Sequence, residues 1–404
     1  MFGLLRELRV IESASFVAGP SCGLHLAQMG AEVIRLDQIG GGPDFRRWPL
    51  SAGGASFYWE GLNKGKKSIA LDLSRQSGRE LALALITAAG ANSGLFVTNF
   101  PAQGFLSYER LSAMRRDLIC LRVMGWADGT QALDYTINSA LGVPLMTGHP
   151  DDDRPVNHVL PAWDLLAGAY GAFALLAAER ERGASGTGRH LQLALADLAA
   201  ASLANLGQVA EVLQSGDRAR IGNDLFGAFG RDFTTSDGHR IMMVAITARQ
   251  WSAAVSACGL GEAIAKLERE LDVSFRDEGE RFKCRSRLFP LFEAVFAART
   301  LAEAAKLLDS SGACWSEYQT LHQAVSGDPR LFGESPIFSI LRQPSGMEYP
   351  AAGAAVRIPG EMRGAAVAAP RLGEHTDEVL SEVLRLSGAE IGRLHEQALV
   401  AGPG

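Results

Sequence analysis

This 404-residue sequence lacks the basic clusters typical of proteins that bind nucleic acid and the long apolar runs typical of proteins that span membranes. It contains no run of five or more basic residues, and its formal net charge is -6 at pH 7. Proteins that bind nucleic acid need clustered lysine and arginine to neutralise phosphates, so we expect no nucleic acid partner. The sequence also lacks any stretch of eighteen apolar residues without a charge. A membrane-spanning helix needs about 20 apolar residues, so we expect no membrane partner.

Cysteine is scarce. The five cysteines are odd in number, lie far apart and form no C-x-x-C pair. A disulfide framework or a zinc knuckle is therefore not expected, and we expect no metal. The segment Met1–Arg9 is too charged and too short for a signal peptide, so the expected location is the cytoplasm.

Motifs that hold nucleotide phosphates are also absent. The triplet Gly40-Gly41-Gly42 follows an expected strand, but the sequence has neither the spaced G-x-G-x-x-G fingerprint nor a Walker lysine motif. A tight turn after the strand explains the triplet equally well. The glycines therefore give no support for a nicotinamide or nucleotide site.

Short apolar runs alternate with helical stretches over the first half of the chain. Strands are predicted at Leu8–Ile11, Ala31–Leu36, Ser68–Leu73, Gly94–Thr98, Leu118–Val123 and Leu191–Leu195, and helices at Cys22–Met29, Gly78–Ala89, Asp164–Arg182 and Asp197–Leu213. Such alternation predicts an α/β fold, with a parallel sheet covered by helices on both faces. Ligands of these sheets bind beyond the carboxyl ends of the strands.

The pattern changes after residue 215. Two β-rich runs flank Asp237-Gly238 and predict a hairpin over Arg231–Ile246, and amphipathic helices follow. The chain length also suits two domains. We therefore expect the first part of a large domain over 1–215 and a smaller α/β domain over 216–330. A return arm over 331–404 would complete the large domain.

Three lysines lie just before one predicted strand, where the segment Asn63–Ser68 reads NKGKKS. The usual interpretation of such a cluster is a solvated surface turn. Lysines at the end of a strand can also hold the phosphates of a nucleotide-like cofactor as point charges. The residues alone leave both interpretations open.

Asp164 begins the long apolar helix and follows His158. Aspartate is a common helix cap. The helix is nearly all apolar up to Glu179, which predicts complete burial, and buried aspartate is rare without a partner. The helix dipole favours the carboxylate, whereas desolvation disfavours it and makes it a better nucleophile. The residues alone leave cap and catalyst evenly balanced.

The chain resembles the family III CoA transferases, the formyl-CoA and carnitine-CoA transferase group, over essentially its whole length. The segments that carry the resemblance occur in family order and are highly specific as a set. They are Phe16–Pro20 (FVAGP), Gly30–Arg35 (GAEVIR), Asn63–Asp72 (NKGKKSIALD), Asn99–Pro101 (NFP), Met146–Gly148 (MTG), Asp164, Thr187–His190 (TGRH) and Leu372–Leu380 (LGEHTDEVL).

The resemblance implies a Rossmann-like large domain built from both chain ends, a smaller domain from the middle, and an interlocked homodimer. It also implies that Asp164 is the nucleophile toward an acyl-CoA substrate. Coenzyme A, carried in by that substrate, would be the only cofactor. The CoA contacts carry over to the matching positions Val17, Ala18, Leu71, Asp72, Leu73, Asn99 and Phe100.

A narrower set of stretches, including GGGPDFRRWPL, VNHVLPAWD and FGAFGRDF, resembles a family member that moves CoA between the two carboxyls of one C5 diacid. The implied intermediate is an aspartyl-CoA thioester, in a pocket that keeps out water and competing acids. An arginine would pair with the free carboxylate, the candidates being Arg46, Arg47 and Arg231. The loop Phe226–Gly230 would stabilise the oxyanion through Gly227, Phe229 and Gly230.

Two other functions remain open. One is transfer between different molecules, with succinyl-CoA or a similar donor and a C4 or C5 dicarboxylate acceptor. The other is a CoA-binding protein without catalysis, in which Asp164 is only a helix cap.

Three positions depart from the family patterns. Val17 replaces a frequent glutamine, which removes that amide from any catalytic role. Gln38 replaces an arginine, which puts one adenine or phosphate contact in doubt. Leu133 stands before Asp134, where the family's α-methylacyl-CoA racemases carry a histidine. The acid–base pair for α-proton exchange is therefore incomplete, which disfavours racemisation.

Overall fold

The computed structural model describes residues 1–90, 92–101 and 103–403, and the chain divides into two compact units. The first unit contains Met1–Leu141, His158–Leu213 and Phe332–Gly404, and the second contains Gly142–Asn157 and Gln214–Leu331. Two of these transitions, after 213 and after 331, lie near the boundaries expected from the sequence. The excursion of 142–157 into the second unit has no counterpart in the sequence analysis.

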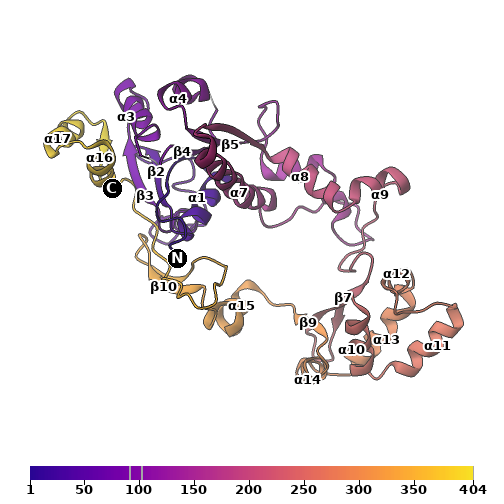
Figure 1. Ribbon diagram of the computed structural model, residues 1–404. Coiled ribbons are helices and arrows are strands. Elements are labelled where there is room, and N and C mark those ends of the chain that lie inside the picture. The colour runs from indigo at the N-terminus through magenta and orange to yellow at the C-terminus, as the bar shows by residue number, and fades with distance from the viewer. Residues whose placement is uncertain (91, 102, 404) are drawn as a thin grey trace. The chain divides into compact units, whose positions relative to one another are not determined.

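A seven-stranded sheet in the order β12-β3-β2-β1-β4-β5-β6 forms the centre of the first unit (Figure 1). Strands β1 to β6 are parallel, and β12 is antiparallel to β3. The strands are β1 (Arg9–Ser13), β2 (Glu32–Gln38), β3 (Lys67–Leu71), β4 (Leu95–Thr98), β5 (Ile119–Met124), β6 (Arg189–Ala194) and β12 (Val400–Ala401). The predicted α/β fold is confirmed. The strand order reverses between β1 and β4, which is where such sheets bind ligands.

Successive residues of each strand face opposite helical layers, as the two-residue period of a strand requires. In β1, Val10 packs toward one layer and Ile11 toward the other. The first layer consists of α1 (Ala18–Gln28) and α7 (Ala162–Ser185). The second consists of α3 (Gln76–Ile86), α4 (Tyr108–Met114), α16 (Thr376–Leu384) and α17 (Gly388–Glu396), with the 3-10 turn Gly104–Leu106 beside them.

Helix α7 packs closely against α1 because it carries glycine at the contact. A Cβ atom added at Gly168 would lie 2.6 Å from the Ser21 side chain. The outer face of the helix is uncovered, however, and Phe173 is 65% exposed and Tyr170 is 47% exposed. The prediction of complete burial was therefore wrong. An apolar helix sequence indicates that each face of the helix will be buried, but it does not indicate whether the same chain or another one buries that face.

Distant parts of the chain meet at α2 (Phe57–Leu62). The Trp59 indole donates a hydrogen bond to the Pro370 carbonyl oxygen at 3.0 Å. The buried Glu60 carboxylate accepts from the Ser345 amide at 2.7 Å and from the Tyr349 hydroxyl at 2.6 Å. Both donors belong to the hairpin of β10 (Phe338–Arg342) and β11 (Glu348–Ala352). The predicted return of the C-terminal segment to the first unit is thus made through specific contacts.

The first unit also contains α5 (Asp134–Ala140), α8 (Leu195–Asn205) and most of α9 (Gln208–Ser215), whose last two residues belong to the second unit. The sequence predicted one continuous helix over the last two. They are separate because Gly207 has a φ of +77°, a left-handed conformation that a helix cannot contain.

The second unit is built around a three-stranded antiparallel sheet of β7 (Phe229–Thr234), β8 (Arg240–Ala245) and β9 (Cys314–Glu317). The predicted hairpin at Asp237-Gly238 is confirmed, and Gly238 has a φ of +84°. Its helices are α6 (Val143–Met146), α10 (Ala248–Ala257), α11 (Gly261–Leu271), α12 (Glu278–Lys283), α13 (Arg285–Ala297), α14 (Leu301–Ser311) and α15 (Leu321–Gly327), with a π-helical turn at Pro329–Gly333. Phenylalanines from β7 and α13, with their rings tilted against one another, fill its core.

Within the described residues, no helix combines the length and the apolar content that a membrane span requires. The longest, α7, has 24 residues, but its last part carries the charged run from Glu179 to Arg182. All five cysteines are free thiols.

Candidate functional site

The loops that follow β1 and β4 are tied together at the switch point of the sheet. The Asn99 side chain accepts a hydrogen bond from the Ser15 amide at 3.0 Å and donates to the Ser15 carbonyl oxygen at 2.7 Å. The next residues on the two loops are the CoA candidates Val17, Ala18 and Phe100. The Phe100 amide donates to the Thr98 hydroxyl at 3.1 Å. The structure therefore brings these four candidates to one edge of the sheet.

The remaining CoA candidates follow β3 at the same edge. Gln38, at the end of β2, accepts from the Leu73 amide at 2.9 Å. Asp72 accepts from the Ser74 amide at 3.0 Å and from its hydroxyl at 2.5 Å. These hydrogen bonds hold the pKa of Asp72 below its ordinary value. Gln38 thus links the ends of β2 and β3, at the position where the family pattern has an arginine. Leu71, the last residue of β3, is fully buried.

Asp164 is the third residue of α7, and it is not the cap of that helix. The N-cap position is Pro161, whose side chain makes no capping hydrogen bond. Instead, one oxygen of the Asp134 carboxylate accepts from the Trp163 amide at 2.7 Å and from the Asp164 amide at 3.1 Å. Within the described residues the Asp164 carboxylate itself has no hydrogen bond or ion pair. Of the two interpretations that the sequence left open for Asp164, helix cap and nucleophile, these contacts favour the nucleophile.

The electrostatic surroundings of Asp164 favour its neutral form. Burial raises the pKa of Asp164 to about 7, the Asp134 carboxylate raises it further, and Arg47 opposes them. A carboxylate that is poorly solvated and unpaired is a stronger nucleophile than one in water. Perturbed carboxyl groups of this kind are concentrated at functional sites.

Arg47, whose charge acts on Asp164, lies near two aromatic rings. Its guanidinium is 5.3 Å from the centroid of Phe16 and 5.3 Å from that of Tyr58. Phe16 has a φ of +66°, a strained conformation for a residue with a side chain. Burial raises the pKa of Tyr58 to about 12, with Arg47 lowering it and Asp164 raising it.

The other two candidate arginines lie in different surroundings. Arg46 is exposed, as Arg47 is, but it borders a cavity of about 200 Å³ together with Arg371 and Trp59. Arg231 belongs to the second unit, where it pairs with Glu293 at 3.3 Å and lies 3.7 Å from Asp224. Of the three, Arg47 is the one whose charge acts on Asp164.

The three lysines before β3 form neither a surface turn nor a row of free charges. Lys66 is buried, and its ammonium group donates to Glu12 at 2.8 Å, to the Pro20 carbonyl oxygen at 2.8 Å and to Asn63 at 3.0 Å. Lys67 pairs with Glu32 at 2.8 Å and Glu378 at 2.6 Å. For Lys66, the surface turn and the phosphate-binding charge predicted above are both wrong, because its ammonium group is buried and paired with a carboxylate. Lys64 is half-buried, which lowers its pKa.

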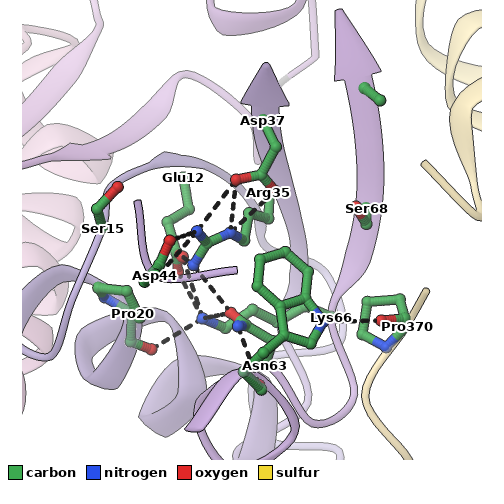
Figure 2. A network of polar contacts seen from close by, with 12 residues as sticks. Glu12, Ser15, Pro20, Arg35, Asp37, Asp44, Asn63, Lys66, Ser68 and Pro370 are labelled. Atoms are coloured by element: carbon green, nitrogen blue, oxygen red, sulfur yellow. Dashed lines mark hydrogen bonds and ion pairs between the residues drawn. The ribbon is translucent and has the colours of Figure 1, made fainter. Parts of the chain in front are cut away.

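Lys66 belongs to a buried ionic cluster, which Figure 2 shows. At its centre the Arg35 guanidinium donates to Asp37 at 3.0 Å and to both oxygens of Asp44 at 3.0 Å. Glu12 lies 3.5 Å from Arg35 and completes three carboxylates around two cations. Burial raises the pKa of Glu12 and of Asp37.

The ionic cluster also fixes the loop that carries Arg47. Asp44 is held by Arg35, and the Asp44 carbonyl oxygen accepts from the Arg47 amide at 3.2 Å. The Arg47 carbonyl oxygen accepts from the Ser56 hydroxyl at 2.5 Å. The loop backbone is therefore anchored to the sheet on one side and to the start of α2 on the other.

The glycine loop predicted to form an oxyanion site belongs to the second unit. Gly227 has a φ of +77° and lies just before β7, whereas Phe229 and Gly230 are residues of that strand. Phe229 is buried in the aromatic core. A Cβ atom at Gly230 would lie 2.8 Å from Val244, so packing alone explains this glycine. An oxyanion role for these residues stays a prediction.

One further sequence pattern is explained by packing. Gly19-Pro20-Ser21-Cys22-Gly23 matches the G-x-S-x-G pattern of serine hydrolases, but Ser21 lies inside α1 and is buried against Gly168. The nucleophile of such enzymes sits exposed on a strained turn between strand and helix. Ser21 is therefore a packing residue.

The sequence analysis missed the roles of Asp134, Phe16 and Tyr58. Asp134 was noted only for the leucine before it, and the other two carry no periodicity that distinguishes them. The pairing of Asp134 with an amide 29 residues away is a tertiary contact that no local pattern encodes.

Comparisons with known proteins give one consistent result. The model of "CoA-transferase family III" matches residues 5–376. The 2-methylfumaryl-CoA isomerase of Chloroflexus aurantiacus is 47% identical over 405 residues, covering 100% of this chain and 99% of that protein. The succinyl-CoA:mesaconate CoA-transferase of Haloarcula hispanica is 27% identical and covers 94% of this chain and 96% of its own. A crystal structure of a CAIB/BAIF family protein from Brucella suis superposes with a TM-score of 0.75 at 27% identity, covering 94% of this chain and 99% of that one.

Proposed function

We start from the fact that this chain belongs to CoA-transferase family III, and we propose that it isomerises 2-methylfumaryl-CoA to 3-methylfumaryl-CoA. The reaction moves coenzyme A from the 1-carboxyl to the 4-carboxyl of one C5 diacid. The observation that carries the proposal is the 47% identity to 2-methylfumaryl-CoA isomerase over the full length of both chains. The raised pKa of the Asp164 carboxyl group, and the absence of a hydrogen bond to it within the described residues, support Asp164 as the nucleophile.

The proposed mechanism uses Asp164 as a covalent catalyst. Its carboxylate attacks the thioester carbonyl, which releases CoA thiolate and leaves a mixed anhydride. The thiolate then attacks the aspartyl carbonyl, which gives an aspartyl-CoA thioester and free 2-methylfumarate. The other carboxylate of the same diacid attacks that thioester and releases the thiolate again. Attack of the thiolate on the new substrate carbonyl yields the 4-thioester and restores Asp164.

Arg47 is the proposed partner of the carboxylate that is not reacting. Its charge acts on Asp164, its guanidinium lies 5.3 Å from each of two ring centroids, and no carboxylate is paired with it within the described residues. A guanidinium binds a carboxylate through two parallel hydrogen bonds. Because the two ends of the diacid exchange roles, the same arginine would serve both halves of the reaction.

The free diacid must stay in place while Asp164 carries the CoA. Water is the main competitor, because it would hydrolyse either the anhydride or the thioester. We propose that CoA binds along the strand ends beside Val17, Ala18, Asn99 and Phe100, with Leu71, Asp72 and Leu73 at the other end. Bound there, it would close the route by which water reaches Asp164. No cofactor other than this CoA is proposed.

A homodimer is proposed to cover the exposed apolar face of the first unit. Exposed apolar side chains there include Tyr170 and Phe173 on α7, and also Leu206, Val209 and Leu213, of which Leu213 is 84% exposed. Large apolar side chains exposed in such number are typical of an interaction site. Interlocking with a second copy, as in the resemblance, would bury them. The cytoplasm is the proposed location.

The test is to incubate the purified chain with 2-methylfumaryl-CoA and 13C-labelled free 2-methylfumarate. Conversion to the 3-methyl isomer with no label in the thioester supports intramolecular transfer. Entry of label supports the second candidate, transfer between molecules, which is favoured by the relatives named as succinyl-CoA-dependent transferases. With neither conversion nor label, a CoA-binding role would remain.

The Asp164→Ala variant tests the nucleophile. Turnover should be lost while CoA affinity changes little, and an enzyme that still turns over contradicts the mechanism. Asp197→Ala is the matched control. Asp197 is the third residue of α8, as Asp164 is of α7, but its side chain is exposed. Hydroxylamine should trap the acylated Asp164 in the wild-type chain only.

A further inference from the structure

Helix α7 begins without a capping side chain of its own. Pro161 stands at the N-cap position and has no side-chain acceptor, although the first amides of every helix need one. The acceptor comes from another helix. Asp134, the first residue of α5, is 1% exposed, and its carboxylate takes the amides of Trp163 and Asp164.

The Asp134 carboxylate is held from its other side as well. Its second oxygen lies 2.8 Å from Nε2 of His158. The neighbouring Tyr135 hydroxyl donates to the Val159 carbonyl oxygen at 3.3 Å, which holds the loop carrying His158 against α5. The Trp163 indole donates to Asn138 at 3.1 Å. Helix α5 therefore holds Trp163 and Asp164, in the first turn of α7, through partly buried polar contacts.

We propose that Asp134 is a positioning residue for Asp164: its carboxylate occupies the amides at the start of α7 that would otherwise bind and stabilise the nucleophile. This inference rests on the proposed function. The start of a helix is an anion-binding site, because its amides are unpaired and the dipole is positive there. An aspartate at the third helical position would ordinarily benefit from those groups.

Asp134 destabilises the ionised Asp164 carboxylate in two ways. It takes two of the free amides, so that the Asp164 carboxylate is left without donors. It also adds a fixed negative charge beside that carboxylate, which raises its free energy. Asp164 loses its charge when it is acylated, and the repulsion then disappears. The arrangement therefore favours the anhydride and the thioester over the free carboxylate.

A purely structural cap would predict something different. Loss of a cap lowers the stability of the helix without changing how readily Asp164 ionises. The positioning role predicts a shift in the ionisation of Asp164 and in its rate of acylation. The titratable groups that face the pair are His158 beside Asp134, and Arg47 and Tyr58 beside Asp164.

The test is Asp134→Asn, which keeps an oxygen acceptor for the α7 amides and removes the charge. We expect the acid limb of the pH dependence of kcat/KM to move down by about one pH unit. We also expect aspartyl-CoA to form at least about tenfold more slowly in a quenched single turnover. CoA affinity should stay unchanged. An unshifted acid limb together with a wild-type acylation rate overturns the proposal.

A second pair of variants covers the case in which Asp134→Asn does not fold. His158→Leu removes the donor to Asp134 and should slow acylation, whereas His158→Gln can still donate and should restore most of the rate. Equal rates in these two variants overturn the proposal. Asp128→Asn is the matched control, because the Asp128 carboxylate caps the exposed turn at Thr130. If the wild-type chain does not isomerise its substrate, the proposed function fails rather than this inference.

Discussion

Replacing Asp164 by asparagine should make the protein inactive and more stable. The pKa of Asp164 is raised from 3.8 to about 7, chiefly by burial and by the Asp134 carboxylate. The folded protein therefore keeps a proton on this group in a pH range where the unfolded chain has lost it. Ionisation of Asp164 opposes folding by an amount that grows as the pH rises from about 4 to about 7 and is constant above that range.

The magnitude follows from the change in pKa. One pKa unit corresponds to about 1.4 kcal/mol, so a rise in the pKa of Asp164 from 3.8 to about 7 can cost at most about 4 kcal/mol in the free energy of unfolding. Asp164 is partly exposed, and solvent screening reduces the gain to about 2 kcal/mol. The asparagine variant should have this advantage at pH 8 and less than half of it at pH 5. Functional sites commonly store such strain at the expense of stability.

The assay is urea unfolding of the wild type and of Asp164→Asn at pH 5 and pH 8. Asp128→Asn is the control of opposite sign, since hydrogen bonds from Thr130 lower the pKa of Asp128. That variant should lose a little stability at pH 8 and regain it as the pH falls. If Asp164→Asn is no more stable than the wild type at pH 8, or if its advantage is independent of pH, the electrostatic reasoning is refuted.

Three further predictions concern the surroundings of the site. Lys66→Met leaves the buried Glu12 without its nearest cation and should cost about 3–5 kcal/mol in the free energy of unfolding. The double variant Glu12→Gln/Lys66→Met should lose less in the same urea assay, and an equal loss would exclude the ion pair as the cause. Arg47→Gln removes the cation that lowers the pKa of Asp164, so the acid limb of kcat/KM should move to higher pH and KM should rise about tenfold. Arg46→Gln, its control, should change neither quantity in steady-state kinetics. Gly168→Ala places a methyl group 2.6 Å from Ser21 and should destabilise the contact of α1 with α7 by about 1–3 kcal/mol. Gly183→Ala, in the same helix but with nothing within 4 Å, should be neutral or slightly stabilising in thermal unfolding, and equal losses in the two variants would contradict the packing argument.

Local patterns in the sequence were enough to predict the parallel sheet. Runs such as Leu8–Ile11 and Ala31–Leu36 are apolar and β-branched because both faces of their strands are covered, and the structure places β1 and β2 there. The hairpin at Asp237-Gly238 was found from its turn residues. Where a nearby chain segment determines the conformation, a local pattern is sufficient.

The same patterns could not predict contacts between distant segments. Lys66 looked like a surface lysine because its partner Glu12 lies 54 residues earlier in the chain. Asp164 could be read as a cap because nothing near it in sequence shows that Asp134 already caps α7. The proposal that Asp164 is the nucleophile came from the family resemblance, since its local sequence is equally typical of an ordinary helix start.

The contacts at α2 have a consequence for the order in which the chain becomes functional during synthesis. Tyr58 and Arg47 emerge early from the ribosome, but α2 is held by Pro370, Ser345 and Tyr349, which are made about 300 residues later. Strand β3 likewise lacks one neighbour until β12 is translated. Helix α2 and strand β3 therefore complete their contacts only after the C-terminal segment has been translated.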